Sequence, residues 1–186
     1  MEGFRFDLTG EEKAYLKDVV RRSIEAGLTR DGEACWKVPE PPTDKLREHL
    51  GAFVCLHIGQ ELRGCIGHIM SDAPLYQTVA QMAQAAAFQD PRFTPLSPDE
   101  FKEVLLEISI LGPISPCPDP NLVEVGRHGL IVRQGHCQGL LLPQVPVEWG
   151  WDREKFLEQT CRKAGLPAKA WRSPDTAIYW FEAVVF

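Results

Sequence analysis

The segment GAFVCLHIGQELRGCIG, residues 51–67, decides the fold of this chain. Its first half, residues 51–58, is apolar, β-branched or aromatic and has glycine on both sides, which is typical of a strand. A tight turn at Gly59-Gln60 leads into a second apolar run over residues 62–67, which carries two more glycines around Cys65. Two such runs joined by a short glycine-containing turn predict a β-hairpin.

The second strand of this hairpin carries few side chains around Cys65, because Gly64 and Gly67 have none. Glycine in a strand interior indicates a β-bulge or a close approach of a ligand or of backbone. Arg63 adds a cation nearby, and a cation lowers the pKa of a thiol and favours the reactive thiolate. Two interpretations stay open. Cys65 is a reactive thiol, or it is a small buried residue where the sheet packs tightly against a helix.

Helices and further strands surround the hairpin. Thr9 and Glu12 have the spacing of a capping box, which predicts a helix that ends at Gly27. The pattern then predicts a short helical segment over residues 43–50 and helices over residues 74–87 and 152–164. It predicts strands over residues 103–111, 129–133, 139–142 and 178–186. This order predicts an α+β fold with largely antiparallel sheets and flanking helices. The proline-dense segment 113–120 is the expected boundary between two unequal lobes of one domain that covers residues 1–186.

Composition excludes several classes of protein. The chain has 186 residues and a net charge of −6, and its basic residues are scattered, which argues against a nucleic-acid binder. No apolar run approaches the about 20 residues that a membrane span needs, and the first residues carry no secretory signal. We therefore expect a cytoplasmic protein whose cysteines are free thiols.

The six cysteines predict neither a disulfide framework nor a metal centre. Cys65 and His68 alone have ligand-like spacing, as an isolated half-pair. Cys55 and Cys161 fall on apolar faces and are expected in the core, whereas Cys35, Cys117 and Cys137 are expected in loops or a hairpin tip. The nucleotide-binding, metalloprotease and esterase motifs are missing, so no cofactor is predicted.

Polar residues outside the hairpin suggest further chemistry. His128 lies between glycines at the start of a strand, where it would serve as a general acid or base, or as a surface turn histidine. Asp90 and Arg92 occupy a rigid turn, either as ligand-binding groups or as a surface salt bridge of little energetic value. Glu107 stands in an apolar strand and either faces solvent or enters a cleft. Gln144 can present its amide to a ligand.

Taken together, these segments resemble the AMMECR1 family, and more narrowly its prokaryotic AmmeMemoRadiSam system members. The resemblance rests on LRGCIG at 62–67, DPRFTPL at 90–96, VGRHGL at 125–130, LLPQV at 141–145 and GWD at 150–152. It implies a larger and a smaller lobe with a cleft between them, an intracellular location, and a radical S-adenosylmethionine protein and a Memo-like protein as partners. It implies no established reaction. His68 departs from the family pattern, in which threonine or a similar residue is more familiar.

Two functional hypotheses follow. In the first, the chain is an enzyme. Cys65, activated by Arg63, is the nucleophile or covalent carrier, and His128 is the base. A small-molecule or peptide ligand would then be oriented by four residues: Gln144, Asp90, Arg92 and Glu107. In the second, the chain is a non-catalytic binding or scaffold module for its two partners, with the proline-rich loop 29–42 and exposed tryptophans as interface candidates.

Overall fold

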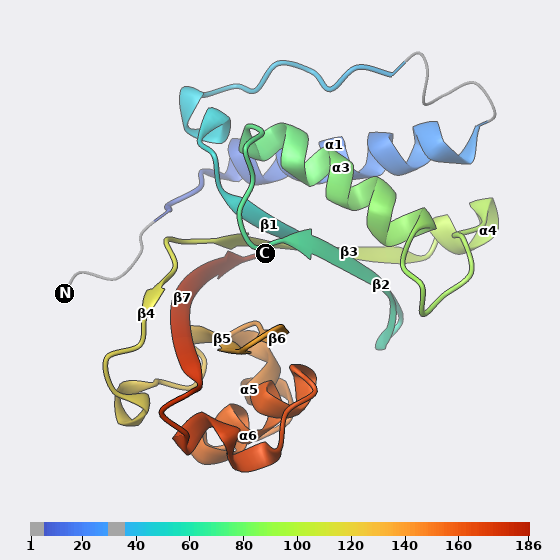
Figure 1. Ribbon diagram of the computed structural model, residues 1–186. Helices are drawn as coiled ribbons and strands as arrows, with labels where there is room; N and C mark the ends of the chain where they lie inside the picture. Colours follow the sequence, from blue (N-terminus) through green and yellow to red (C-terminus); the bar gives the residue numbers. More distant parts are fainter. Residues whose placement is uncertain (1–5, 30–35) are drawn as a thin grey trace. The chain divides into compact units, whose positions relative to one another are not determined.

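The computed structural model describes residues 6–29 and 36–186, and its α+β architecture confirms the predicted fold class (Figure 1). The chain forms two compact units. The N-terminal unit is Phe6–Leu111 together with Val184–Phe186, and the C-terminal unit is Gly112–Ala183. The chain passes from the first unit to the second just before the proline-dense segment 113–120. The expected cleft between lobes stays a prediction.

An antiparallel sheet forms one layer of the N-terminal unit. Its strands are β1 (Gly51–Ile58), β2 (Glu61–His68) and β3 (Val104–Leu111). The predicted hairpin is confirmed, because β1 pairs with β2 on one side and with β3 on the other. On the outer side of β3, Ile108 and Phe186 exchange two backbone hydrogen bonds of 3.0 and 3.1 Å. β2 is therefore the strand whose second edge pairs with no other strand of this unit.

Two helices cover one face of this sheet. They are α1 (Gly10–Leu28) and α3 (Leu75–Phe88), which lie side by side in Figure 1. The predicted capping box opens α1, since Thr9 and Glu12 exchange hydrogen bonds of 2.8 and 3.1 Å. The core between helices and sheet is made of side chains with no exposed surface, among them Leu16, Val20, Val54, Leu56, Val79 and Ile108. Two short elements, η1 (Asp44–Arg47) and α4 (Pro98–Phe101), complete the unit.

The glycines around Cys65 have the two physical causes that the sequence allowed. First, β2 is bulged, because His57 pairs with Leu62 while Leu56 pairs with Gly64, which leaves Arg63 without an opposite residue. Second, α3 touches β2 backbone to backbone. A Cβ atom on Gly64 would lie 2.2 Å from the carbonyl oxygen of Ala86 in α3. Glycine is therefore required there to let the helix sit on the strand.

The strands of the C-terminal unit are also antiparallel. They are β4 (Ser115–Pro116), β5 (His128–Gln134), β6 (Cys137–Leu141) and β7 (Ala177–Val185), of which the last two residues of β7 belong to the N-terminal unit. β5 pairs with β6 and β7, and β4 pairs with β7. The predicted second hairpin and terminal strand are thus confirmed.

Helices pack on the strands of this unit around Phe156, Leu157 and Cys161. The predicted helix is α6 (Arg153–Lys163), capped by Asp152, and it is joined by α5 (Gln144–Glu148), η2 (Pro120–Leu122) and η3 (Ala168–Arg172). α5 was not predicted from the sequence. Across residues 6–29 and 36–186, no helix combines the length and the apolar character that crossing a membrane requires.

Candidate functional site

Two charged side chains hold the backbone of Cys65 at the edge of β2. The backbone N–H of Cys65 donates to Oδ2 of Asp90 at 2.9 Å, and Nη2 of Arg92 donates to the carbonyl oxygen of Cys65 at 3.2 Å. Asp90 and Arg92 are themselves joined by bonds of 2.9 and 2.7 Å. The pair thus satisfies the two backbone groups that an edge strand leaves open. We call these two side chains the edge clip.

The carboxylate of this clip is buried, which corrects one alternative from the sequence. Asp90 is only 4% exposed, so its ion pair with Arg92 is not the surface salt bridge of little value considered above. Hydrogen bonds from Arg92 are the main reason why the pKa of Asp90 lies well below its usual value, although burial opposes this shift. Asp90 is therefore ionised in the folded chain. Its carboxylate accepts a hydrogen bond from the backbone of Cys65.

Arg63 is bound to the carboxylate of Glu100 and to a backbone carbonyl group. Its Nε donates to Oε1 of Glu100 at 2.8 Å, and its Nη2 donates to Oε2 of Glu100 at 3.2 Å and to the carbonyl oxygen of Thr94 at 2.9 Å. The bonds from Arg63, together with those from Ser97, lower the pKa of Glu100 to about 2. A bulge changes the direction of the side chain it carries. Arg63 at the bulge forms an ion pair with Glu100 of α4. Activation of Cys65 by Arg63 stays a prediction.

Cys55 and Cys65 lie directly opposite each other on β1 and β2, with Cα atoms 4.1 Å apart, and a disulfide joins them. The backbone groups of Cys65 point outward to the edge clip. The two residues therefore form the non-hydrogen-bonded kind of antiparallel pair, in which side chains approach most closely. The expectation of free thiols is wrong for these two residues. Among the other described cysteines, Cys117, Cys137 and Cys161 are free, and Cys35 lies outside the described residues.

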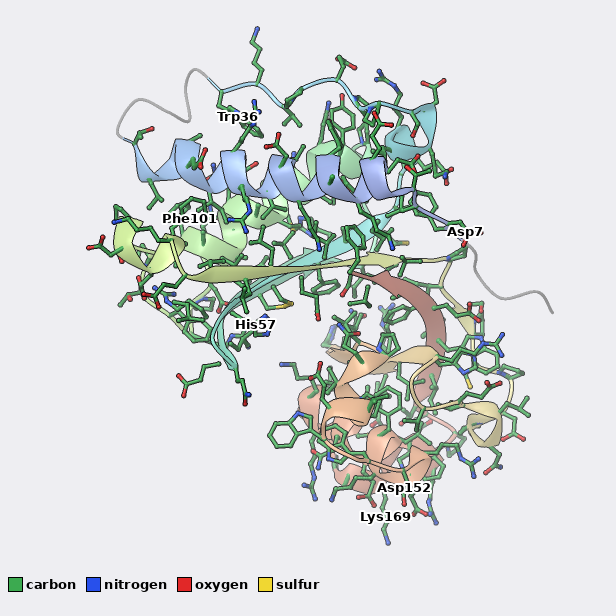
Figure 2. All side chains as sticks on the ribbon, turned by 180° about the vertical axis from the view of Figure 1, so that it is seen from behind. Asp7, Trp36, His57, Phe101, Asp152 and Lys169 are labelled. Atoms are coloured by element: carbon green, nitrogen blue, oxygen red, sulfur yellow. A yellow bond between two sulfur atoms is a disulfide. The ribbon has the colours of Figure 1, made fainter. Side chains whose placement is uncertain are left out.

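A third candidate side chain continues this row. Glu107 of β3 is the register partner of Cys55, so Cys65, Cys55 and Glu107 share one level across three strands. Directly paired residues point to the same face of a sheet. Gly64, one residue away, faces α3, so the row points to the opposite side. We call this side the helix-free face; Figure 2 shows His57 of β1 on it, away from α1.

His128 is buried in the C-terminal unit and held in one tautomer. Its ring is 7% exposed and lies against Trp180, with ring centroids 4.5 Å apart. Nδ1 accepts a hydrogen bond of 3.0 Å from the backbone N–H of Glu124. The neutral ring therefore carries its proton on Nε2 and can donate from there. Burial lowers the pKa of His128, so the neutral form is favoured.

The remaining predicted residues divide between the two units. Cys65, Arg63, Asp90, Arg92 and Glu107 all belong to the N-terminal unit, and His128 and Gln144 belong to the C-terminal unit. The pairing of Cys65 with His128 therefore stays a prediction. Gln144 is the first residue of α5 and is half-buried. No bulge separates Cys65 from His68, so their side chains point to opposite faces of β2 and do not pair.

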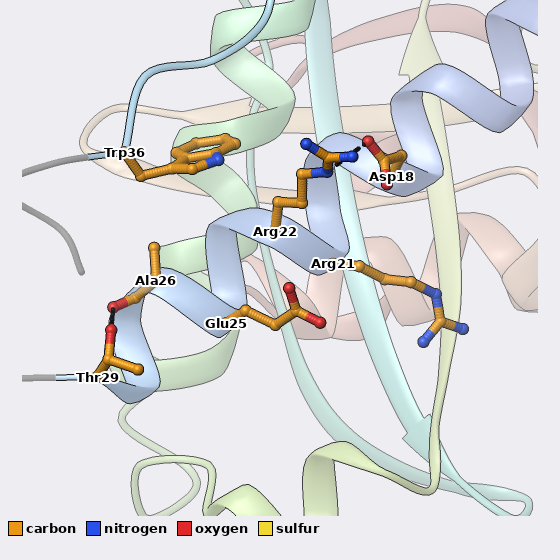
Figure 3. A pocket seen from close by; sticks show the side chains of 7 residues that line it. All are labelled: Asp18, Arg21, Arg22, Glu25, Ala26, Thr29 and Trp36. Atoms are coloured by element: carbon orange, nitrogen blue, oxygen red, sulfur yellow. Dashed lines mark hydrogen bonds and ion pairs between the residues drawn. The ribbon is translucent and has the colours of Figure 1, made fainter.

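A second surface feature lies on the far side of the sheet. An open depression at the carboxyl end of α1 is lined by Asp18, Arg21, Arg22, Glu25, Ala26, Thr29 and Trp36 (Figure 3). Two of its charges form an ion pair, since Nε of Arg22 and Oδ2 of Asp18 lie 2.8 Å apart and both side chains are about half exposed. Such a pair contributes little. Within the described part of the chain, no three acidic, histidine or cysteine side chains converge as metal ligands.

Comparison with known proteins fits this arrangement of motifs. The AMMECR1 family model matches residues 17–186, nearly the whole chain. The chain belongs to the AMMECR1 family. The edge clip and the cysteine row therefore lie inside the AMMECR1 domain, since residues 55, 65, 90, 92 and 107 all fall within the matched range.

AMMECR1 relatives cover the chain almost end to end. A protein from Thermococcus gammatolerans is 45% identical over 92% of this chain and 88% of its own length. Protein MK0488 from Methanopyrus kandleri is 46% identical over 96% of this chain and 89% of its own. The crystal structure of uncharacterized protein PH0010 from Pyrococcus horikoshii has a TM-score of 0.86 at 40% identity, and the likeness covers 97% of this chain and 93% of that one.

Proposed function

We propose that this AMMECR1 protein is a cytoplasmic component of an AmmeMemoRadiSam-type system and that Cys65 is the centre of its active or ligand-binding site. The site is the helix-free face around the row of Cys65, Cys55 and Glu107. The observation that carries this proposal is the edge clip. A buried, ionised Asp90 and its partner Arg92 fix the backbone of Cys65 from outside the sheet.

The edge clip supports a functional cysteine because it holds the residue without occupying its side chain. The clip residues bond to the N–H and the carbonyl oxygen of Cys65, so neither of them engages its sulfur, which is joined to Cys55 and can react on the helix-free face once that disulfide is reduced. A side chain whose backbone is held on both sides is well suited to chemistry that needs a fixed geometry. Glu107 and His57 would line the approach to the sulfur. Asp90 and Arg92 are then positioning residues, and contact with substrate is not required of them.

A second function has its own observation. Trp149 is 70% exposed and Val147 is 58% exposed, and the ring of Trp149 stacks on Trp151 with centroids 6.1 Å apart. Exposed tryptophan of this kind is enriched at protein interfaces. This supports the non-catalytic alternative, in which α5 docks a radical S-adenosylmethionine protein or a Memo-like protein.

One experiment separates the two functions. The full chain is co-expressed with its radical S-adenosylmethionine and Memo-like partners. Assembly is measured by co-purification, and turnover of S-adenosylmethionine is measured on the complex. We expect Cys65→Ser to leave assembly intact and to abolish turnover that depends on this chain. Cys137→Ser is the matched control, since Cys137 is exposed at the tip of the second hairpin. Trp149→Ala tests the docking alternative.

The outcomes divide cleanly. Loss of turnover with intact assembly in Cys65→Ser supports chemistry at the cysteine. Loss of assembly in Trp149→Ala, with Cys65→Ser fully active, would replace the proposal by the docking module. Iodoacetamide labelling of the reduced protein against pH adds an independent measure. A pKa of Cys65 at or above that of an ordinary thiol, unaffected by His128→Ala, would exclude an activated nucleophile.

A further inference from the structure

We propose that Cys55 and Cys65 form a reversible dithiol–disulfide couple, in which Cys65 exchanges with low-molecular-weight disulfides and Cys55 resolves the mixed disulfide. This inference rests on the proposed function, because it concerns the same site. It assigns a role to Cys55, which the sequence placed in the core. The proposal rests on one observation. The pairing of β1 with β2 places Cys55 and Cys65 opposite each other, with Cα atoms 4.1 Å apart, and a disulfide joins them.

The positions of the two cysteines assign their roles. Cys65 lies on β2, the edge strand of the N-terminal unit, and is half-buried. Cys55 lies on β1 between two paired strands and is 6% exposed. An incoming disulfide therefore reaches the sulfur of Cys65 first. Access therefore makes Cys65 the better attacking group.

The couple closes in two balanced steps. The thiolate of Cys65 attacks one sulfur of an external disulfide, which forms a mixed disulfide and releases one thiolate of the external molecule. The thiolate of Cys55 then attacks the sulfur of Cys65, which forms the Cys55–Cys65 bond and releases the second external thiolate. Two protein thiols are oxidised and one external disulfide is reduced to two thiols. Excess external thiol reverses both steps.

The backbone makes this cycle easy to run in both directions. Cysteines with distant Cα atoms need backbone movement to form or break a bond. Here the register of β1 and β2 holds both residues in place, and the edge clip fixes Cys65 from the other side whether or not the sulfurs are joined. Oxidation then requires only side-chain rotation. The fold does not depend on the bond for its topology, because the hairpin is closed by its own hydrogen bonds.

A purely structural role accounts poorly for this disulfide. In the chain-entropy view, a disulfide stabilises a fold more when it closes a longer loop. This bond spans a sequence separation of 10, across a hairpin with a tight turn. Its contribution to the free energy of unfolding is therefore at the low end of the range for disulfides. A reducing compartment also favours the dithiol form, so a pair in this position is suited to switching.

The test uses the full-length chain in mixtures of reduced and oxidised glutathione. Thiols are trapped by rapid alkylation and located by peptide mapping. We expect the wild-type chain to lose the thiols of Cys55 and Cys65 together, with little glutathione on either residue. Cys55→Ser should accumulate a stable glutathione adduct on Cys65, with about tenfold higher occupancy than in the wild type. Cys55→Ala repeats the measurement should the serine variant fold poorly. Cys137→Ser is the control and should behave as the wild type.

Several results would overturn the couple. One is a Cys55–Cys65 bond that survives excess thiol in the folded chain, which would mark it as structural. Another is the absence of an adduct on Cys65 in both Cys55 variants. The proposed function fails separately, when Cys65→Ser retains full turnover with its partners. A couple that cycles in a chain whose Cys65→Ser variant is fully active would leave the exchange chemistry standing and remove the active-site role.

Discussion

The backbone N–H of Cys65 donates a 2.9 Å hydrogen bond to the carboxylate of Asp90, which stands 25 residues later in the chain. This bond ties the edge of the N-terminal sheet to the turn that follows α3. Since Asp90 is buried and ionised, it also gives Arg92 its direction. The position of the candidate cysteine thus depends on a side chain from a different element.

Removing the carboxylate should destabilise the N-terminal unit. Asp90→Ala leaves the N–H of Cys65 without its acceptor and the guanidinium of Arg92 without its ion pair. We expect the free energy of unfolding to fall by about 2–4 kcal/mol, measured by urea denaturation. The control is Asp99→Ala, whose side chain is 92% exposed beside Lys102. It should change stability by less than about 0.5 kcal/mol. Equal effects of the two variants would contradict a structural role for the clip.

The contact between α3 and β2 should tolerate no side chain. In Gly64→Ala the new Cβ would meet the carbonyl oxygen of Ala86 at 2.2 Å, so helix and strand must separate. We expect a loss of about 1–3 kcal/mol or more in the free energy of unfolding, measured by thermal and urea denaturation. Gly10→Ala is the control, because nothing lies within 4 Å of its new Cβ. A Gly64→Ala variant as stable as this control would show that α3 does not sit on β2 as described.

Glu100 should make stability depend on pH in the acid range. Arg63, together with Ser97, lowers the pKa of Glu100 to about 2 from a usual value of 4.5. A carboxyl whose pKa is lower in the folded state stabilises the fold above its unfolded pKa and loses that contribution as the pH falls through the folded pKa. Stability should therefore drop between about pH 4.5 and pH 2. In Glu100→Gln this part of the drop should be absent. Parallel stability profiles of the two proteins would argue against the ion pair.

His128 should titrate below the usual histidine range as the Nε2–H tautomer. Its pKa is lowered because the ring is buried. Its protonation therefore opposes folding as the pH falls below about 6.5, the usual value for histidine. Nitrogen-detected NMR should show a proton on Nε2, since Nδ1 accepts from Glu124. Trp180→Leu should uncover the ring and raise the pKa toward its usual value. A His128 that titrates in the same range in both proteins would mean that burial is not the cause.

Local pattern was enough to predict most of the architecture. The glycines at 51 and 59, the capping box at Thr9 and the cap at Asp152 each mark an element by short-range chemistry, and the structure follows them. α5 was missed because two prolines lie at or beside a helix of only five residues. Proline is tolerated in the first turn of a helix, and a helix of five residues is hardly longer than its first turn.

The partner of Cys65 could not be predicted because it depends on a bulge. The turn at Gly59-Gln60 pairs Ile58 with Glu61 and His57 with Leu62. Continued without interruption, this register would set Cys55 opposite Gly64 and leave the two cysteines out of line. The extra residue Arg63 shifts the pairing by one and brings Cys55 opposite Cys65. The glycines suggested a bulge. The sequence does not show whether it comes before or after Cys65, and this position decides which residue lies opposite the cysteine.

The long-range partners were also beyond local pattern. Arg63 stands two residues from Cys65 in the chain, so proximity in sequence suggested that its charge acts on the thiol. Glu100 lies 37 residues away and accepts a hydrogen bond from Arg63. The capping box of α4, Ser97 with Glu100, carried a usable signal, because it fixes where a carboxylate must sit. Nothing in the sequence links that carboxylate to Arg63.

The edge clip has a further consequence for the chain outside its site. An exposed strand edge is a template on which a second chain can pair, and such pairing leads to domain swapping and aggregation. At Cys65 the donor and the acceptor of β2 are already taken by Asp90 and Arg92. The same two side chains that fix the cysteine thus block strand pairing at this point of the edge. Site geometry and protection of the edge share a single pair of residues.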